Sequence, residues 1–265
     1  MTESDHLQIP VVDLHSHLVP GVDDGSDTVA ESITALTRLY DEGVGVLVTT
    51  PHLLLPHLGS QEAIDRELGR HRRAFHQLAL ACLERDDVPS IALGQEIWAP
   101  DAAAMRRVVR RSDVGLAGGR FLLVEFGFEL QGNHNDVVRE VQENGRRIVI
   151  AHPERYHYLP GHDPLDVMQA WQDLGALLQV NVGSLTGHYE RSNPGAEALA
   201  WQMVELGLVD LFSTDHHGPR REGVSPREAL DALLARGQRA LAERAMAVLP
   251  GLIARNEPAG SRLPR

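Results

Sequence analysis

The sequence predicts an α/β fold, a single domain built as a distorted, TIM-like (β/α)7 barrel. Short runs rich in Val, Ile and Leu alternate with amphipathic helical stretches along the chain. These runs are regularly followed by His, Asp or Glu, and the length of 265 residues suits a barrel, which typically has about 250 residues. A closed parallel barrel gathers the carboxyl ends of its strands on one face, so this fold would bring those side chains together.

The first half of the chain supplies three predicted strands and two predicted helices. Val11 and Val12 begin the first strand, and the sequence Thr-Val-Ala-Glu at 28–31 is a capping box that starts a helix reaching Gly43. A buried strand over 44–49 then ends at Thr-Pro-His, with His52 last. A long amphipathic helix and a third strand that ends at Gly-Gln-Glu complete this half, over 61–85 and 90–93.

The second half repeats the alternation of strand and helix. Strands are predicted over 121–124, 147–151, 177–180 and 209–212. Helices are predicted over 102–111, 135–144, 164–174, 196–206, 225–235 and 238–249. The expected organisation is an N-terminal extension, one barrel domain and a polar C-terminal tail that we expect to be disordered, over 1–10, 11–250 and 251–265.

Composition excludes several classes of function. The chain has 25 basic and 37 acidic residues, a net charge of −12, and every basic residue is Arg, because the sequence contains no Lys. An acidic surface offers little to nucleic acid or to an anionic membrane. Without Lys, a Walker A loop, a Schiff-base lysine and a carboxylated-lysine metal bridge are impossible. We find no long apolar run and no export signal, so we expect a cytoplasmic protein without membrane insertion.

The residues after the strands form a candidate metal site. His15 and His17 are two positions apart at the end of an extended strand, so both imidazoles point to the same side. Buried carboxylates without counter-charges would raise one another's pKa, a cost that two or three divalent cations remove. The full set of candidate ligands is His15, His17, Asp24, His52, Glu96, Glu125, His152, Asp215 and His217.

Several short motifs in fixed order carry a family resemblance. They are Asp-Leu-His-Ser-His at 13–17, Pro-Gly-Val-Asp-Asp-Gly at 20–25, Thr-Pro-His at 50–52, Gly-Gln-Glu at 94–96, Val-Glu-Phe at 124–126, Ala-His-Pro-Glu-Arg-Tyr at 151–156, Asn-Val-Gly-Ser at 181–184 and Asp-His-His at 215–217. With these motifs the chain resembles the polymerase-and-histidinol-phosphatase (PHP) superfamily over residues 11–249. Within it, the chain is most similar to the bacterial tyrosine-protein phosphatases encoded with capsular and exopolysaccharide systems.

The resemblance implies a PHP-type barrel with three divalent ions, usually manganese, with iron or zinc as alternatives. The first ion would be bound by His15, His17, Glu96 and Asp215. Glu96 would bridge to the second ion, which would also be bound by Glu125 and His152. The third ion would be bound by Asp24, His52 and His217.

The resemblance also implies the chemistry and the substrate. Arg155 matches an arginine that contacts phosphate, and either Arg220 or Arg221 is expected to supply a second. The implied reaction is hydrolysis of phosphotyrosine by a metal-activated hydroxide. The implied partner is a phosphotyrosine protein, a bacterial tyrosine kinase of polysaccharide synthesis or export. The oligomeric state stays open.

Three other interpretations remain at this stage. A PHP-family phosphatase could act on a small phosphomonoester such as histidinol phosphate. An amidohydrolase-like barrel also opens with His-x-His, although the missing Lys and the presence of both Glu96 and Glu125 count against it. A metal-stabilised binding module would need a site closed by protein ligands. Among nearby side chains, we expect Trp98 to pack rather than to line the substrate pocket, and His71 to lie on a solvated helix face.

Overall fold

The strands of the protein follow a distorted ring, as the computed structural model shows for residues 9–132, 134–221 and 223–256. In these ranges the strands are β1 Val11–Asp13, β2 Val44–Thr49, β3 His52–Leu54, β4 Ser90–Leu93, β5 Glu96–Trp98, β6 Phe121–Glu125, β7 Arg147–Ala151, β8 Leu177–Asn181 and β9 Leu211–Ser213. All pairs are parallel, in two sheets with the orders β1-β2-β4 and β3-β5-β6-β7-β8-β9.

The two sheets are joined on both sides, which gives the ring seven strand positions. On one side β3 and β5 continue β2 and β4, and the Glu96 amide donates to the Pro51 carbonyl at 3.2 Å across the break. On the other side β9 meets β1, where the Asp215 amide donates to the His15 carbonyl at 2.8 Å and the His17 amide to the His216 carbonyl at 2.7 Å. The predicted distorted (β/α)7 barrel is therefore confirmed, as two joined sheets and not one continuous closed sheet.

The strands predicted over 44–49 and 90–93 are confirmed as β2 and β4, and each is followed by a second, short strand that begins at a candidate ligand. Pro51 has no N–H to donate to a ladder, and a side chain at Gly94 would lie 3.2 Å from the Leu116 Cα. The chain leaves the ladder after β2 and β4 and re-enters it in β3 and β5. His52 and Glu96 follow the predicted strands, as expected, and they also begin the two short strands, in which they face each other.

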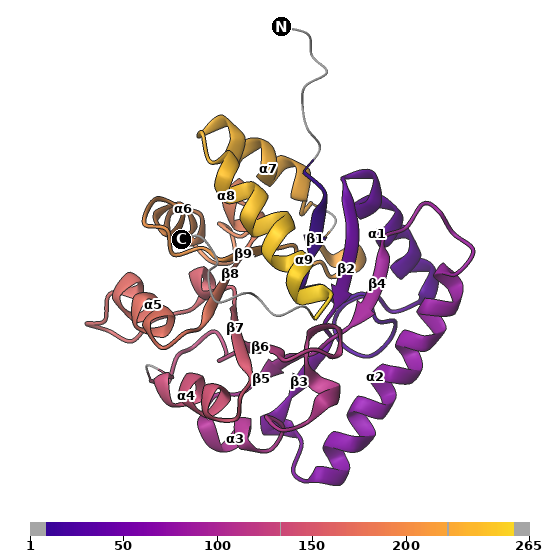
Figure 1. Ribbon diagram of the computed structural model, residues 1–265, viewed down its shortest axis with the longest axis horizontal. Helices are drawn as coiled ribbons and strands as arrows, with labels where there is room; N and C mark the ends of the chain where they lie inside the picture. Colours follow the sequence, from indigo (N-terminus) through magenta and orange to yellow (C-terminus); the bar gives the residue numbers. More distant parts are fainter. Residues whose placement is uncertain (1–8, 133, 222, 257–265) are drawn as a thin grey trace, which may run out of the picture.

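The helices surround the strands on the outside (Figure 1). The described ranges contain α1 Val29–Asp41, α2 Gln61–Cys82, α3 Ala102–Arg106, α4 Asn135–Glu143, α5 Pro164–Asp173, α6 Ala196–Glu205, α7 Pro226–Ala235, α8 Arg239–Glu243 and α9 Leu249–Ala254. The N-cap half of the predicted capping box is present, since the Thr28 hydroxyl accepts from the Glu31 amide at 3.2 Å, whereas the Glu31 carboxylate accepts from the Asp27 amide at 2.7 Å. The helix predicted over 102–111 ends early, at Arg106, and a π-helical turn over Arg244–Val248 separates α8 from α9.

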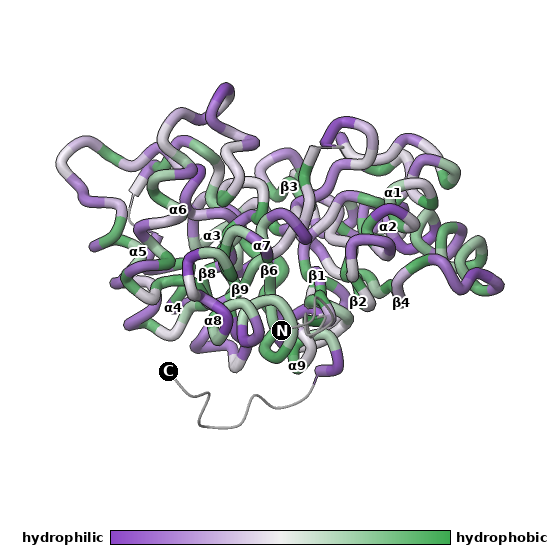
Figure 2. Tube along the Cα trace, turned by 90° about the horizontal axis from the view of Figure 1, so that it is seen from above, coloured by the Kyte–Doolittle hydropathy of each residue, from purple (hydrophilic) through white to green (hydrophobic). Residues whose placement is uncertain are grey.

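Apolar side chains fill the barrel from the end at which the strands begin. The inward cluster includes Val12, Leu123 and Val149, and Leu249 and Ile253 of α9 close it. Figure 1 shows α9 lying across the centre of the strands. A second, larger cluster packs the outer faces of the strands against the helices. In the tube view the hydrophobic stretches gather in the strands while hydrophilic residues dominate the outer loops (Figure 2).

The ends of the chain refine the predicted organisation. Ile9, placed in the N-terminal extension, is buried against the core. Residues 251–254, placed in the polar tail, belong to α9, and Ile253 is buried. The rest of the N-terminal extension, residues 1–8, lies outside the described residues. So do residues 257–265, on which the predicted disorder of the tail falls. Within the described ranges, the helices are all too short or too polar to cross a membrane.

Candidate metal centre and active site

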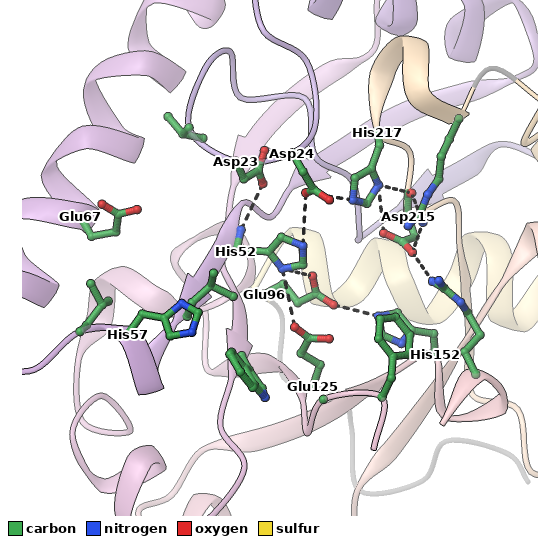
Figure 3. A pocket seen from close by; sticks show the side chains of 18 of the residues that line it. Asp23, Asp24, His52, His57, Glu67, Glu96, Glu125, His152, Asp215 and His217 are labelled. Carbon is green, nitrogen blue, oxygen red and sulfur yellow. Dashed lines mark hydrogen bonds and ion pairs between the residues drawn. The ribbon is translucent and has the colours of Figure 1, made fainter. Parts of the chain in front are cut away.

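The nine predicted ligands meet at the end of the barrel opposite α9. Figure 3 labels all of them except His15 and His17. They come from every strand position except that of β8. His15 and His17 follow β1, Asp24 lies in the loop after them, His52 begins β3, Glu96 begins β5, Glu125 ends β6, His152 follows β7, and Asp215 and His217 follow β9. Seven of the nine are buried, His52 is partly exposed, and the Asp24 side chain is 64% exposed.

The deepest group lies where β1, β5 and β9 meet. The Nε2 atoms of His15 and His17 are 3.2 Å apart. Asp215 Oδ1 lies 3.4 Å from the first and 3.3 Å from the second. Glu96 approaches both imidazoles at 3.3 Å, with Oε1 near His15 and Oε2 near His17. His15, His17 and Glu96 thus lie close enough together to bind one ion, whereas Asp215, the fourth residue implied for the first ion, groups with His15 and His152.

The group around Glu96 is arranged differently from the implied set. His52 Nδ1 lies 2.8 Å from Glu96 Oε2 and 3.7 Å from Glu125 Oε1, so His52 joins the two glutamates. His152 Nε2 lies 3.0 Å from Glu96 Oε1. However, His152 groups with His15 and Asp215 rather than with Glu125. Glu96 therefore stands between two clusters, the position expected of a bridging ligand.

The third group lies nearest the opening. Asp24 Oδ1 is 3.3 Å from His217 Nε2 and 3.5 Å from His52 Nε2. The His17 ring stacks on the His217 ring with their centres 4.0 Å apart. The three residues implied for the third ion are therefore together, and His17 adjoins them.

The charges of the cluster fit divalent cations. Burial, with repulsion from Glu96, raises the pKa of Glu125 to about 8. Glu96 Oε2 and His52 Nδ1 are buried and have no partner of hydrogen-bond geometry among the described residues, although they are only 2.8 Å apart. Imidazole nitrogens with carboxylate oxygens form a donor set that suits manganese, iron or zinc. Bound cations would stabilise the ionised form of Glu125 and satisfy both orphaned atoms.

Two polar residues that the sequence analysis did not assign orient the first pair of histidines. His17 Nδ1 lies 2.8 Å from Asp23 Oδ2, and His15 Nδ1 lies 2.8 Å from Gln179 Oε1. Each contact places the ring proton on Nδ1 and leaves the Nε2 lone pair directed at the cluster. Gln179 could have been found from sequence, because a glutamine within the apolar run of β8 needs a buried partner.

Two of the candidate ligands have a strained backbone. His152 has a φ of 35° and Asp215 a φ of 51°, both in the left-handed region. This conformation costs about 1–2 kcal/mol for a residue with a Cβ. Such strain concentrates at functional sites, where the required direction of a side chain outweighs the energetic cost of the backbone conformation. At both positions a strand ends and the chain turns with the ligand pointing into the cluster.

The three candidate arginines separate into two roles. Arg155 donates to Asp215 Oδ2 at 2.8 Å, and Arg221 donates to the same oxygen. Both arginines line the pocket. Arg220 instead donates to the backbone carbonyls of Asp24, at 2.9 Å, and Gly25, and so holds the loop that carries Asp24. Of the two alternatives, Arg221 is the one that faces the cluster.

A pocket of about 620 Å³ opens onto the cluster. All the candidate ligands except His15 and His17 line it, together with Arg155 and Arg221. The rest of the lining combines an apolar wall, formed by Leu54, Leu58, Trp98 and Phe128, with polar side chains such as Arg70. Figure 3 shows His57 and Glu67 at the far end of the pocket from Asp215. Trp98 therefore lines the pocket, contrary to our expectation.

His71 is the second corrected expectation, because it is buried. Its Nδ1 lies 2.7 Å from Gln95 Oε1, next to the ligand Glu96. It therefore supports the loop before β5 and does not face solvent.

The fold and the cluster are those of a metal-dependent hydrolase built on a parallel barrel. The chain belongs to the capsular polysaccharide synthesis family CpsB/CapC, whose family model matches residues 11–245.

Curated relatives share about a quarter of their residues with this chain. Tyrosine-protein phosphatase YwqE of Bacillus subtilis is 25% identical over 224 residues, which is 84% of this chain and 84% of that protein. The putative tyrosine-protein phosphatase CapC of Staphylococcus aureus is 28% identical over 211 residues, 78% of this chain and 77% of that protein.

Solved structures support the fold. A chain from the crystal structures of YwqE from Bacillus subtilis and CpsB from Streptococcus pneumoniae, described as unique metal-dependent tyrosine phosphatases, superposes with a TM-score of 0.76. It is 24% identical, and the match covers 93% of this chain and 95% of that one. The lactonase Lmo2620 from Listeria monocytogenes has a TM-score of 0.53 at 15% identity, over 93% of this chain and 95% of that one.

Proposed function

We propose that this chain is a metal-dependent protein-tyrosine phosphatase that acts in the cytoplasm on a bacterial tyrosine kinase of polysaccharide synthesis or export. One observation carries the proposal: a single pocket combines a cluster of metal ligands, two arginines and an apolar wall. The family and the names of its curated members support the same activity.

Three divalent ions are proposed, preferably manganese, with iron or zinc as alternatives. The ligands would be His15, His17, Asp24, His52, Glu96, Glu125, His152, Asp215 and His217. When bound, the ions would lower the pKa of a water molecule to about 7 and polarise the phosphoryl group. Asp23 and Gln179 would keep the first two imidazoles in the tautomer that ligation requires.

Arg155 and Arg221 would bind the phosphoryl oxygens beside the cluster. Both guanidinium groups are held by Asp215 Oδ2, while Oδ1 of the same carboxylate faces the histidines. Arg155 Nε is buried and has no acceptor in the part of the chain that the structure describes. A phosphoryl oxygen is the acceptor that this geometry lacks, and charge-assisted hydrogen bonds from Arg stabilise the charge of the transition state.

The apolar wall would bind the tyrosine ring. A phosphotyrosine places a flat ring between its phosphate and its backbone, so the ring would lie along Trp98 and Phe128 while the peptide stays outside. A phosphoserine is too short to reach the cluster unless its backbone enters the pocket. The phenol leaving group has a pKa of about 10, so it departs without a dedicated general acid.

The test is hydrolysis of a phosphotyrosine peptide, a phosphoserine peptide and histidinol phosphate by protein that has been stripped with chelator and resupplied with manganese. We expect metal-dependent release that favours the phosphotyrosine peptide and disappears in His15→Ala. A preference for histidinol phosphate would overturn the substrate and keep the site. No metal-dependent phosphate release from any ester would overturn the proposed function.

A further inference from the structure

The Tyr189 side chain packs against the two arginines of the pocket but does not line the pocket itself. Arg155 Cζ lies 4.2 Å from the centre of the Tyr189 ring, and Arg221 Cζ lies 5.5 Å from it. The Tyr189 side chain is buried, with 4% of the residue exposed. Its hydroxyl is 3.4 Å from Arg221 NH1 and 3.4 Å from Asn181 Nδ2. The Tyr189 ring therefore faces both cations, and its hydroxyl accepts from Asn181, the asparagine that donates to Asp215 Oδ2 at 2.8 Å.

The two guanidinium groups need such a support. They converge on one oxygen, Asp215 Oδ2, so two like charges are brought close together in a buried region. An aromatic face attracts a cation through its negative quadrupole, and this attraction increases when the cation loses solvent. Arg155 has a second aromatic neighbour, since its Cζ lies 4.9 Å from the Phe128 ring. Among the described residues, Tyr189 is the aromatic side chain recorded against both arginines.

We propose that Tyr189 is a positioning residue that fixes the spacing and direction of Arg155 and Arg221, and thereby sets the affinity of the pocket for a phosphoryl group. This inference rests on the proposed function. Tyr189 acts through the two arginines and does not touch the substrate. Its loss should therefore weaken phosphate binding and leave the metal content unchanged, because the two arginines contact Asp215 through Oδ2, while Oδ1 of the same carboxylate faces the metal cluster.

The variants distinguish the effect of losing the aromatic ring from the effect of losing the hydroxyl and from general destabilisation of the protein. Tyr189→Phe keeps the aromatic face. Tyr189→Met fills a similar space without a π system, because methionine adapts to irregular cavities. Trp201→Met is the matched control, since it removes a cation–π contact outside the pocket, where Arg236 Cζ lies 3.5 Å from the centre of the Trp201 ring. Each variant is checked for thermal unfolding and for manganese content by elemental analysis.

The measurement is the dissociation constant of inorganic phosphate, taken by calorimetry on the manganese-loaded protein, together with KM and kcat for a phosphotyrosine peptide. We expect Tyr189→Met to weaken phosphate binding and raise KM by about 3- to 30-fold, the size of one or two cation–π contacts. Tyr189→Phe should stay within about 3-fold of wild type, and Trp201→Met should bind phosphate like wild type. Manganese content should be equal in all of them.

A double-mutant cycle tests whether the effect passes through the arginines. In an Arg221→Met background, Tyr189→Met should add clearly less than it does in the wild type, because one of its two partners is gone. Equal phosphate affinity in Tyr189→Met and wild type, or a full additive loss in the cycle, would overturn the inference. If Tyr189→Met fails to fold, Tyr189→Phe decides, and a loss as large as that of Arg221→Met would overturn it. Phosphate binding is measured without turnover, so a wild-type protein that hydrolyses no phosphotyrosine would contradict the proposed function and leave this test intact.

Discussion

The two ends of strand β7 use different residues for the same backbone conformation, and this difference holds for the two ends of the barrel as a whole. The strand is preceded by Gly145, with a φ of 71°, and followed by His152, with a φ of 35°. Both residues are in the left-handed region, but only the glycine adopts it without strain. Where the chain merely turns from helix α4 into the strand, the sequence uses glycine. Where the chain must also aim a ligand, it uses histidine and accepts the strain.

The same contrast holds across the barrel interior. At the end closed by α9, the interior is filled with side chains such as Leu123, Val149 and Leu249, which contribute stability through burial. At the other end, the interior is filled with imidazoles and carboxylates whose pKa values are shifted by burial and by one another. We infer that the α9 end provides stability and the cluster end provides chemistry, so mutations at the two ends should have separable effects.

The largest expected effect is at the cluster end. His152→Asn should lower kcat/KM by about 1,000-fold, because a metal ligand supplies several kcal/mol of transition-state stabilisation. Asparagine tolerates a positive φ, so the free energy of unfolding of the chelator-treated protein should change by only about 1 kcal/mol. Rates with saturating manganese and chemical denaturation measure the two quantities.

Gly145→Ala is the matched control on the same strand. The added Cβ would meet nothing within 4 Å, so the cost is confined to the positive φ, about 1 kcal/mol of stability, with no change in kcat/KM. An activity loss in Gly145→Ala, or an unfolding-linked loss in His152→Asn, would contradict the division between the two ends.

The next effect is at the opposite end. Leu249 is 1% exposed and closes the apolar interior. Leu249→Ala should lower the free energy of unfolding by about 2–5 kcal/mol through lost burial and the cavity left behind. At a temperature at which the variant remains folded, its kcat/KM should equal that of wild type. A selective fall in kcat would show that α9 takes part in the chemistry.

A smaller effect should separate the neighbouring arginines. Arg221→Ala should raise KM for the phosphotyrosine peptide and the Ki of inorganic phosphate by about 10- to 100-fold, since hydrogen bonds from a charged donor contribute about 1.5–3 kcal/mol. Arg220→Ala loosens the loop that carries Asp24, so it should weaken metal affinity while phosphate affinity at saturating manganese is kept. The reverse pattern would exchange the assigned roles.

The smallest effect is a pH dependence of metal binding. Burial opposes protonation of His52, but the charge of Glu96 outweighs it and raises the pKa of His52 to about 10, while neighbouring carboxylates raise the pKa of His17. At pH 7 the His52 imidazole is therefore protonated in the metal-free protein, and it must lose a proton to bind metal. Manganese affinity should fall as pH decreases, by up to about tenfold per pH unit for each released proton.

Calorimetric titration in two buffers of different ionisation enthalpy counts the released protons. Binding without proton release would contradict the protonation states assigned to the cluster. The raised pKa of His52 also contributes stability to the metal-free fold. That contribution is fully present below the ordinary histidine value of about 6.5 and is lost as the pH rises through about 10.

Much of the site could be predicted because a barrel converts sequence position into spatial position. Each candidate ligand ends or follows a strand run, and the parallel barrel brings those ends together. The same logic extends to the strained residues, since His152 and Asp215 lie where strands give way to turns.

Other features depend on contacts that the sequence does not display. Whether Arg220 or Arg221 faces the cluster is decided by the 3-10 turn at Gly218–Arg221, which points one guanidinium outward. His52 faces Glu96 because β3 and β5 continue β2 and β4 in the same register, which becomes visible only when the strands are paired in space. The burial of His71, however, could have been predicted from the sequence. It follows Ile64 by seven residues and precedes Leu78 by seven, which places it on the buried face of α2.

The measurement that most directly tests the account is the manganese stoichiometry of chelator-treated protein, titrated at neutral pH while phosphotyrosine hydrolysis is followed on the same sample. The account predicts three ions per chain, with activity rising to its plateau as the last site fills. A single ion that restores full activity, or full activity with no bound ion, would contradict a multinuclear centre at the cluster end of the barrel.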